Sequence, residues 1–326
     1  MANTKVAVIG LGGTIAMRSS GSGAVPSLAA EDLVSLLPEN AASLVGHVEN
    51  FRQVPGAHLE LEDLVALAAR IRELDENGTA GGFVVVQGTD TIEETVFALE
   101  ILFGGNAPVV VTGAMRHAGQ VSADGAANIS NALYLADSAE AAGRGAMVCF
   151  NDEVHAAWAV QKTSATNAAA FSSPGFGPVG HVIEGRARFL CDVQRWPSVR
   201  ADHLVSAKVA IVTASLGEGP ELVDAVGQGS YAGLVVQATG AGHLHHSWVE
   251  PLERLAAKMP VVLATRVSRG PVLSKTYAFP GSESDLLSRG LISAGFLCAS
   301  KARILLSLAL GAGMAPGAIG ELFGSL

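Results

Sequence analysis

The chain has 326 residues, of which 49% are apolar, 16% charged and 5% aromatic, and its net charge at pH 7 is −9. This length and apolar content suit two domains with aliphatic cores and exclude an intrinsically disordered protein. The acidic charge, without a Lys/Arg cluster longer than a pair, argues against nucleic acid as a partner and favours a small-molecule ligand.

Strand and helix patterns alternate through the first half of the chain. Strands are predicted at residues 6–13, 83–88, 108–114 and 146–152, and helices at residues 61–74 and 90–102. No hairpin dipeptide is recognised after these strand patterns, which is typical of parallel strands joined by helices.

The second half repeats the alternation. Strands are predicted at residues 209–215, 233–240 and 260–266, and helices at residues 221–228, 248–258 and 300–310. Residues 188–204 show neither period. We therefore predict an α/β fold: an N-terminal α/β domain over residues 1–190 with a doubly wound, mainly parallel sheet, a linker over 191–206, and a smaller C-terminal α/β domain over 207–326.

Features of membrane, secreted and zinc proteins are missing from the sequence. No run of 18 apolar residues occurs, and the three cysteines, Cys149, Cys191 and Cys298, form no CxxC pair. The N-terminus leads into a strand pattern without the features of a signal peptide. We expect a cytoplasmic protein with no membrane association.

Two threonines stand where a parallel sheet usually binds its ligand, beyond the carboxyl ends of the strands. Thr14 follows Gly13 after the first strand pattern, and Thr89 follows Gly88 after the second. A hydroxyl on a glycine turn beside unpaired backbone N–H groups can act as a nucleophile next to an oxyanion site.

A threonine hydroxyl needs a base to become a nucleophile. Lys162, in a segment of small residues, and Asp90, adjacent to Thr89, can supply a lysine base held by a carboxylate. The local sequence equally allows Asp90 to cap the helix over residues 90–102, with Glu93 completing a capping box.

Motifs for cofactors and metals are incomplete. The G-x-G at Gly10 and Gly12 is followed by Ile15 where a dinucleotide fingerprint needs Gly or Ala, and no P-loop, GxSxG or HExxH motif occurs. His243, His245 and His246 cluster without nearby carboxylates or cysteines, which favours a solvated loop over a metal site. We expect neither a metal nor a cofactor.

Four ordered motifs resemble those of the bacterial-type L-asparaginase (asparaginase/glutaminase) family. They are GGTIA at residues 12–16, GTDTIEET at 88–95, GAMR with SADG within 113–125, and KT at 162–163. The resemblance extends over essentially the whole chain. It implies a two-domain asparaginase-like fold and an amidohydrolase that converts L-asparagine to L-aspartate and ammonia through a threonine acyl-enzyme, without metal or cofactor.

The resemblance also implies roles for individual residues. Thr14 matches the nucleophile, and Thr89, Asp90 and Lys162 match the second threonine with its Asp–Lys relay. The residues expected to contact the substrate are Gly13, Ala57, His58, Gly88, Ala114, His243 and Glu283. In the family, the positions of His243 and Glu283 are contributed by a neighbouring subunit of a homodimer, usually within a homotetramer.

The sequence departs from the family at three places. Residues 17–28 contain no tyrosine where the family has one, and their Ser/Gly content predicts a flexible lid. Ala57 and His58 stand near a polar Ser-Gln pair of the family, and His243 stands near an asparagine. These departures leave open a hydrolase of a substituted or cyclic amide.

Two further alternatives belong to other classes. A non-catalytic amino-acid-binding protein would not need the activated threonines. An RNA-linked amidotransferase subunit would need a basic patch for tRNA, which the sequence does not provide.

Overall fold

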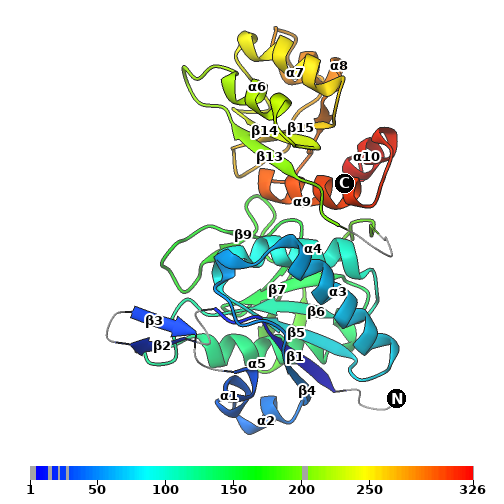
Figure 1. Ribbon diagram of the computed structural model, residues 1–326. Helices are drawn as coiled ribbons and strands as arrows, with labels where there is room; N and C mark the ends of the chain where they lie inside the picture. The colour runs from blue at the N-terminus through cyan, green and yellow to red at the C-terminus, as the bar shows by residue number, and fades with distance from the viewer. Residues whose placement is uncertain (1–4, 14–16, 21–22, 27–28, 200–204, 326) are drawn as a thin grey trace. The chain divides into compact units, whose positions relative to one another are not determined.

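The chain was described from a computed structural model, which covers residues 5–13, 17–20, 23–26, 29–199 and 205–325. Contacts between its residues divide it into two compact units, Met1–Ser198 and Val199–Leu326. Each unit has its own sheet and its own helices (Figure 1). The expected two-domain α/β architecture is confirmed.

The N-terminal unit is built on an eight-stranded sheet with the order β12-β11-β8-β7-β6-β5-β1-β4. The strands are β1 (Val6–Gly10), β4 (Val45–Asn50), β5 (Gly82–Val86), β6 (Val109–Thr112), β7 (Ala146–Phe150), β8 (Glu153–Ala156), β11 (Gly180–Ile183) and β12 (Arg186–Phe189). All pairs from β4 to β7 are parallel, and β1, β5, β6 and β7 follow the predicted strand patterns. These four strands are completely buried, which explains their continuous apolar runs.

The far edge of this sheet is antiparallel, which the strand patterns did not predict. The β7–β8 hairpin turns at Asn151 and Asp152, which have positive φ angles of 49° and 67°. The β11–β12 hairpin turns at Glu184 and Gly185 in the same way. Two consecutive residues with positive φ are typical of a type I′ turn, in which Asn and Asp are favoured. β12 also extends to Phe189, so the first two residues of the supposedly unstructured segment 188–204 are in a strand.

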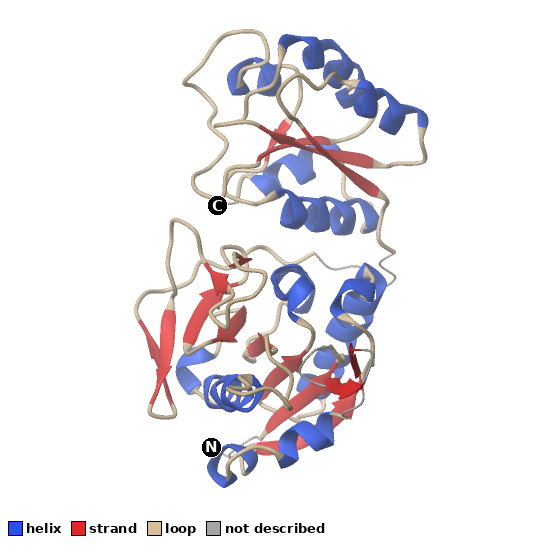
Figure 2. Ribbon diagram, turned by 90° about the vertical axis from the view of Figure 1, so that its left-hand side faces the viewer, coloured by secondary structure: helices blue, strands red, loops and turns tan. Residues whose placement is uncertain are grey.

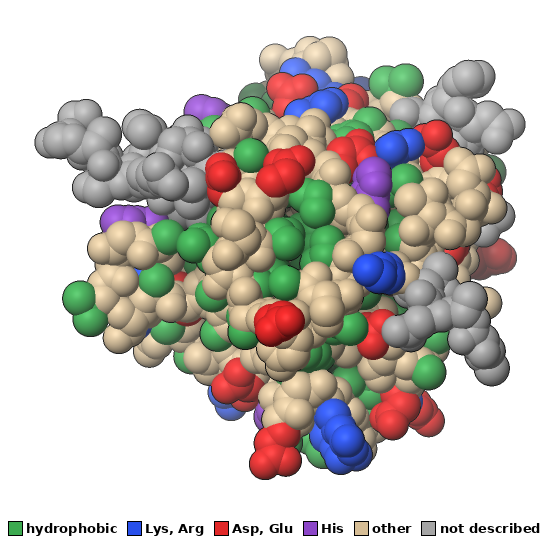
Figure 3. Space-filling view, turned by 90° about the horizontal axis from the view of Figure 1, so that it is seen from below, with side chains coloured by type: hydrophobic (Ala, Val, Ile, Leu, Met, Phe, Trp, Pro, Cys, Tyr) green, Lys and Arg blue, Asp and Glu red, His purple; other side chains and the backbone are tan. Residues whose placement is uncertain are grey.

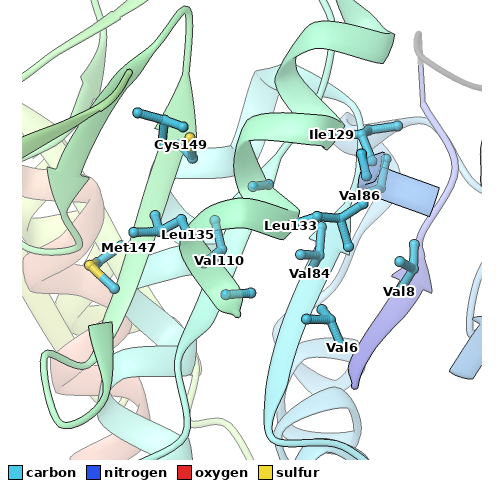
Figure 4. Close-up of a cluster of buried hydrophobic side chains, with 14 of the residues drawn as sticks. Val6, Val8, Val84, Val86, Val110, Ile129, Leu133, Leu135, Met147 and Cys149 are labelled. Carbon is cyan, nitrogen blue, oxygen red and sulfur yellow. The ribbon is translucent and has the colours of Figure 1, made fainter. Parts of the chain in front are cut away.

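Helices lie on both faces of the large sheet. They are α1 (Ala30–Ser35), α2 (Glu39–Ala42), α3 (Leu61–Glu76), α4 (Ile92–Phe103) and α5 (Gly125–Ala136), with 3₁₀ turns η2 (Gly56–His58), η3 (Thr89–Thr91) and η4 (Ala139–Ala141). Valines of β1, β5 and β6 pack against Ile129 and Leu133 of α5 in one aliphatic core (Figure 4). Because strand side chains alternate, the other face of the sheet is available to α4, which packs against β6 and β7.

Two short antiparallel pairs accompany the sheet. One joins β2 (Met17–Ser20) to β3 (Gly23–Pro26), within the segment predicted as a lid. The other joins β9 (Gln161–Lys162) to β10 (Phe171–Ser172). The second pair carries the lysine that the sequence motifs single out.

The C-terminal unit has a parallel four-stranded sheet with helices on both sides (Figure 2). Its strands, in sheet order, are β13 (Val209–Thr213), β14 (Gly233–Ala238), β15 (Val261–Thr265) and β16 (Ile292–Ser293). Its helices are α6 (Glu221–Gln228), α7 (Val249–Ala256), α8 (Glu283–Ser288), α9 (Ala299–Gly311) and α10 (Pro316–Phe323), with a 3₁₀ turn η5 (His246–Trp248). Among the helices of the described ranges, none is long and apolar enough to cross a bilayer.

Candidate active site

Three glycines let the loops after β1, β4 and β5 touch backbone to backbone. Gly13 has a φ of +89°, and a Cβ placed on it would lie 2.1 Å from the backbone nitrogen of Gly88. A Cβ on Gly88 would in turn lie 3.0 Å from the backbone nitrogen of Gly56. Any side chain at Gly13 would therefore force these loops apart. Thr14, the predicted nucleophile, is the next residue of the chain and lies outside the described residues.

Gly56 begins the turn that carries Ala57 and His58. The hydroxyl of Thr91 donates to the Gly56 carbonyl at 3.0 Å and accepts a 3.3 Å bond from the buried side chain of Gln87. Ala57 and His58 are both exposed in this turn. The structure thus brings the predicted substrate-contacting turn beside the Gly88 loop, although these two positions are far apart in sequence.

Thr89, Asp90 and Lys162 meet at the end of β5. The Lys162 Nζ atom lies 3.0 Å from Thr89 Oγ1 and 2.8 Å from Asp90 Oδ1. Thr89 is buried, whereas the side chain of Asp90 is 66% exposed and that of Lys162 is 17% exposed. A lysine in contact with both a hydroxyl and a carboxylate can exchange a proton with the hydroxyl while the carboxylate holds it in place.

The alternative capping role of Asp90 is wrong. The residues Thr89–Thr91 form a 3₁₀ turn, α4 begins at Ile92, and its N-cap residue, Thr91, makes no side-chain cap bond. The Asp90 carboxylate instead accepts a charge-assisted hydrogen bond from the ammonium of Lys162, at 2.8 Å. Glu93 does not complete a capping box either; its Oε2 atom accepts the backbone N–H of Lys162 at 2.5 Å.

Ala114 has a different environment from the other predicted contacts. It is fully buried in the α5-side core, so its side chain packs against other apolar groups and is not exposed to a ligand. Asp124 holds this loop by accepting the backbone N–H groups of Met115 and Arg116 at 3.0 and 2.9 Å. The side chain of Asn128 donates to the Gly113 carbonyl at 3.0 Å. These bonds assign a structural role to the SADG motif.

His243 and Glu283 form a pair within the C-terminal unit. Glu283 is fully buried; its Oε1 accepts the backbone N–H groups of Thr276 and Tyr277 at 2.9 and 2.8 Å, and its Oε2 lies 3.2 Å from His243 Nε2. Burial alone would raise the pKa of Glu283, but the backbone N–H groups and the His243 ring together lower it. The half-exposed rings of Tyr277 and Phe279 stand edge-on to the imidazole.

The remaining histidines of this loop do not form a metal site. The Nδ1 atom of His245 accepts the backbone N–H of Ser247 and caps η5. Across the residues that the structure describes, no three His, Cys, Asp or Glu side chains are grouped as metal ligands.

A separate hollow lies between α1 and α5. Seen from below, this end of the N-terminal unit exposes apolar side chains between charged ones (Figure 3). The hollow is lined by Leu33, Leu36, Arg116, Ala118, Ala123, Gly125, Ala126 and Ile129. With one guanidinium and no carboxylate or hydroxyl among these described lining residues, it lacks the groups for proton transfer that the Thr89 cluster has.

Comparison with known proteins agrees with this geometry. The family model "Asparaginase, N-terminal" matches residues 5–195, and the model "Glutaminase/Asparaginase C-terminal domain" matches residues 208–323. The chain belongs to the asparaginase family. It is therefore an amidohydrolase of the asparaginase type, and the expectation from the sequence motifs is confirmed.

Individual relatives cover nearly the whole chain. A probable L-asparaginase of Deinococcus radiodurans is 36% identical over 95% of this chain and 94% of its own length. A probable periplasmic L-asparaginase of Haemophilus influenzae is 33% identical over 94% of this chain and 88% of its own length. The solved structure of a probable cytoplasmic L-asparaginase from Campylobacter jejuni superimposes with a TM-score of 0.89 at 32% identity, covering 99% of this chain and 100% of that one.

Proposed function

We propose that this protein hydrolyses the side-chain amide of L-asparagine to L-aspartate and ammonia, with Thr14 as nucleophile and Thr89, Asp90 and Lys162 as the proton relay. The observation that carries the proposal is the contact of Lys162 Nζ with both Thr89 Oγ1 and Asp90 Oδ1, at 3.0 and 2.8 Å. The L-asparaginases among its relatives support the choice of substrate.

The reaction proceeds in two halves. In the first, Thr14 Oγ forms a bond to the amide carbon, the carbon–nitrogen bond breaks, and the hydroxyl proton leaves with the ammonia. In the second, a water molecule forms a bond to the same carbon, the ester bond to Thr14 breaks, and Thr14 regains a proton. In each half, the proton of the attacking hydroxyl or water passes through Thr89 to the amine of Lys162 and returns from it to the leaving group, the amide nitrogen first and the Thr14 oxygen second; Asp90 keeps the lysine in reach.

The chain's own atoms can bind the substrate around this relay. In the proposal, backbone N–H groups of the loops at Gly13 and Gly88, which touch each other, stabilise the developing oxyanion, and Ala114 follows the neighbouring strand β6. Ala57 and His58 face solvent beside Gly88, where they can meet the substrate's amino-acid head group. In this proposal the reaction uses no metal or cofactor.

The assembly and location follow the same reasoning. We propose a cytoplasmic homodimer or homotetramer in which His243 and Glu283 of one copy complete the substrate site of another. The buried Glu283 carboxylate and the half-exposed rings around His243 support a role in binding rather than in proton transfer.

A second candidate is the hydrolysis of a substituted or cyclic amide. Ala57 offers no side-chain donor to a carboxylate, and the Nε2 atom of His243 is already in contact with Glu283. A free amino-acid head group that lacks partners in a closed site would cost several kcal/mol.

Ammonia release from L-asparagine, L-glutamine and a panel of substituted and cyclic amides distinguishes the candidates. We expect release from L-asparagine, its loss in Thr14→Ala and Thr89→Val, and full activity in Thr79→Val, which alters an exposed threonine ten residues before Thr89. Background turnover of asparagine with cleavage of another amide would favour the second candidate. An acyl adduct on Thr14, detected by mass spectrometry, tests the nucleophile directly.

A further inference from the structure

The lysine of the relay stands on a very short strand. β9 contains Gln161 and Lys162 alone, and pairs with β10 in the register Lys162 with Phe171. The backbone N–H of Thr163 donates to the Ala170 carbonyl at 2.8 Å, so the Thr163–Ala170 pair is hydrogen-bonded. Since such pairs alternate in an antiparallel ladder, the Lys162–Phe171 pair is not, and the Lys162 N–H points away from β10.

Glu93 receives this outward-pointing N–H. Its Oε2 atom lies 2.5 Å from the Lys162 backbone nitrogen and is part-buried. The carboxylate comes from the first turn of α4, whose Ile92 and Val96 are fully buried, so it is held by a rigid element. A bond from a backbone N–H to a carboxylate is among the stronger hydrogen bonds in proteins.

Residues at the start of α4 therefore bind Lys162 both at its side-chain nitrogen and at its backbone. Thr89 and Asp90, just before the helix, hold the Nζ atom, and Glu93 holds the backbone of the same residue. A lysine side chain has four rotatable methylene links, so contacts at Nζ alone do not fix its approach to a reacting hydroxyl. Fixing both ends restricts the side chain to conformations that span the two contacts.

We propose that Glu93 is a positioning residue for the amidase reaction, which sets the place of Lys162 by accepting its backbone N–H. The inference rests on the proposed function, because it assigns Lys162 to the relay. It explains why Glu93 turns away from the N-cap of its own helix, where the local sequence would allow a capping box. Its role is exerted through Lys162 and not by contact with substrate.

Paired substitutions test the proposal. Glu93→Ala removes the acceptor, and we expect kcat for the best amide substrate to fall by about 10- to 100-fold with little change in KM, as for a displaced catalytic group. Glu93→Gln keeps a carbonyl oxygen at the same reach and should stay within about threefold of the parent. Glu221→Ala is the matched control, because Glu221 is an exposed acidic residue in the first turn of α6.

Hydrogen exchange at the Lys162 amide gives a measurement that does not depend on activity. We expect exchange to accelerate by about tenfold or more in Glu93→Ala and to stay near the parent rate in Glu93→Gln. If the alanine variant does not fold, Glu93→Asp, which is one methylene shorter, takes its place with the same expected losses.

The outcomes separate this inference from the function on which it rests. A parent protein that hydrolyses no amide overturns the proposed function, while the exchange data still show whether Glu93 holds the Lys162 backbone. An active parent with Glu93→Ala within twofold of its kcat overturns the positioning role. Equal losses in Glu93→Ala and Glu93→Gln also overturn it, since they would trace the effect to charge.

Discussion

Two acid–base pairs, Asp90 with Lys162 in the N-terminal unit and Glu283 with His243 in the C-terminal unit, differ in the solvent exposure of the acid. In the N-terminal unit, Asp90 is 66% exposed while it accepts the 2.8 Å bond from Lys162. In the C-terminal unit, Glu283 is fully buried and receives two backbone N–H groups besides His243. Exposed pairs contribute at most about 1 kcal/mol, whereas breaking a buried pair costs several. Lys162 can therefore change partners during a reaction, whereas Glu283 is held in place by its buried contacts.

The largest effect is expected from a substitution that breaks the Asp90–Lys162 pair. Lys162→Met removes the ammonium but keeps most of the apolar stem, so kcat should fall by about 10²- to 10⁴-fold, the usual range for a lost general acid or base. Because the Asp90 carboxylate is open to water and stays solvated without its partner, the free energy of unfolding should change by less than about 1 kcal/mol. Ammonia release and urea unfolding measure both, with exposed Lys258→Met as the control. A loss of activity that follows a loss of stability would contradict this reading of the pair.

Substitution at the close backbone contact between Gly13 and Gly88 gives the next largest expected effect. Gly13→Ala places a Cβ 2.1 Å from the Gly88 nitrogen, and overpacking together with positive-φ strain should lower the free energy of unfolding by about 3 kcal/mol. Gly78 has a φ of +65° but open space around its Cβ, so Gly78→Ala isolates the strain at about 1 kcal/mol. Equal losses in the two variants, measured by denaturant unfolding, would show that the loops separate at no cost.

The stability contributed by the buried Glu283–His243 pair should depend on pH. The Glu283 pKa is lowered below its ordinary 4.5, so its contribution to stability is fully present above pH 4.5 and is lost as pH falls through the folded value. Glu283→Gln should cost about 2 kcal/mol at neutral pH, with the difference from the parent shrinking in acid. Urea unfolding across that range measures it. If the stability difference between Glu283→Gln and the parent grew in acid, the Glu283 pKa would be raised and not lowered on folding, which would refute this prediction.

Glu100 is a second buried glutamate, and its substitution has the smallest expected effect. Burial raises the pKa of Glu100 despite the Arg195 guanidinium and the backbone N–H groups of Ala146 and Trp196. Its stabilising contribution is therefore greatest below its ordinary pKa of 4.5 and declines as pH rises through the folded value. The difference between Glu100→Gln and the parent should shrink toward neutral pH, opposite to Glu283→Gln. If the stability differences of Glu100→Gln and Glu283→Gln from the parent changed in the same direction with pH, this prediction would be contradicted.

The sequence patterns predicted the buried parallel strands better than the other strands. β1, β6 and β7 lie within their predicted ranges and β5 begins one residue before its own, because strands buried on both faces read as unbroken β-branched runs. β4 lies at the opposite edge and is only partly buried, so its six residues show no such run. The predicted strand over residues 146–152 includes Asn151 and Asp152, which in the structure form the turn of the β7–β8 hairpin, a position that suits an Asn-Asp pair.

Sequence alone determined the fold class and the family, because both depend on local periodicity and on short motifs of glycine and threonine. The tertiary structure decided which of two local roles Asp90 and Glu93 take. Their partner, Lys162, lies 72 and 69 residues further along the chain, so no nearby pattern could reveal it. A hydrogen bond between distant segments exists only once both are packed in place, and here packing of α4 against the β9 strand turns two possible capping residues into supports for a lysine.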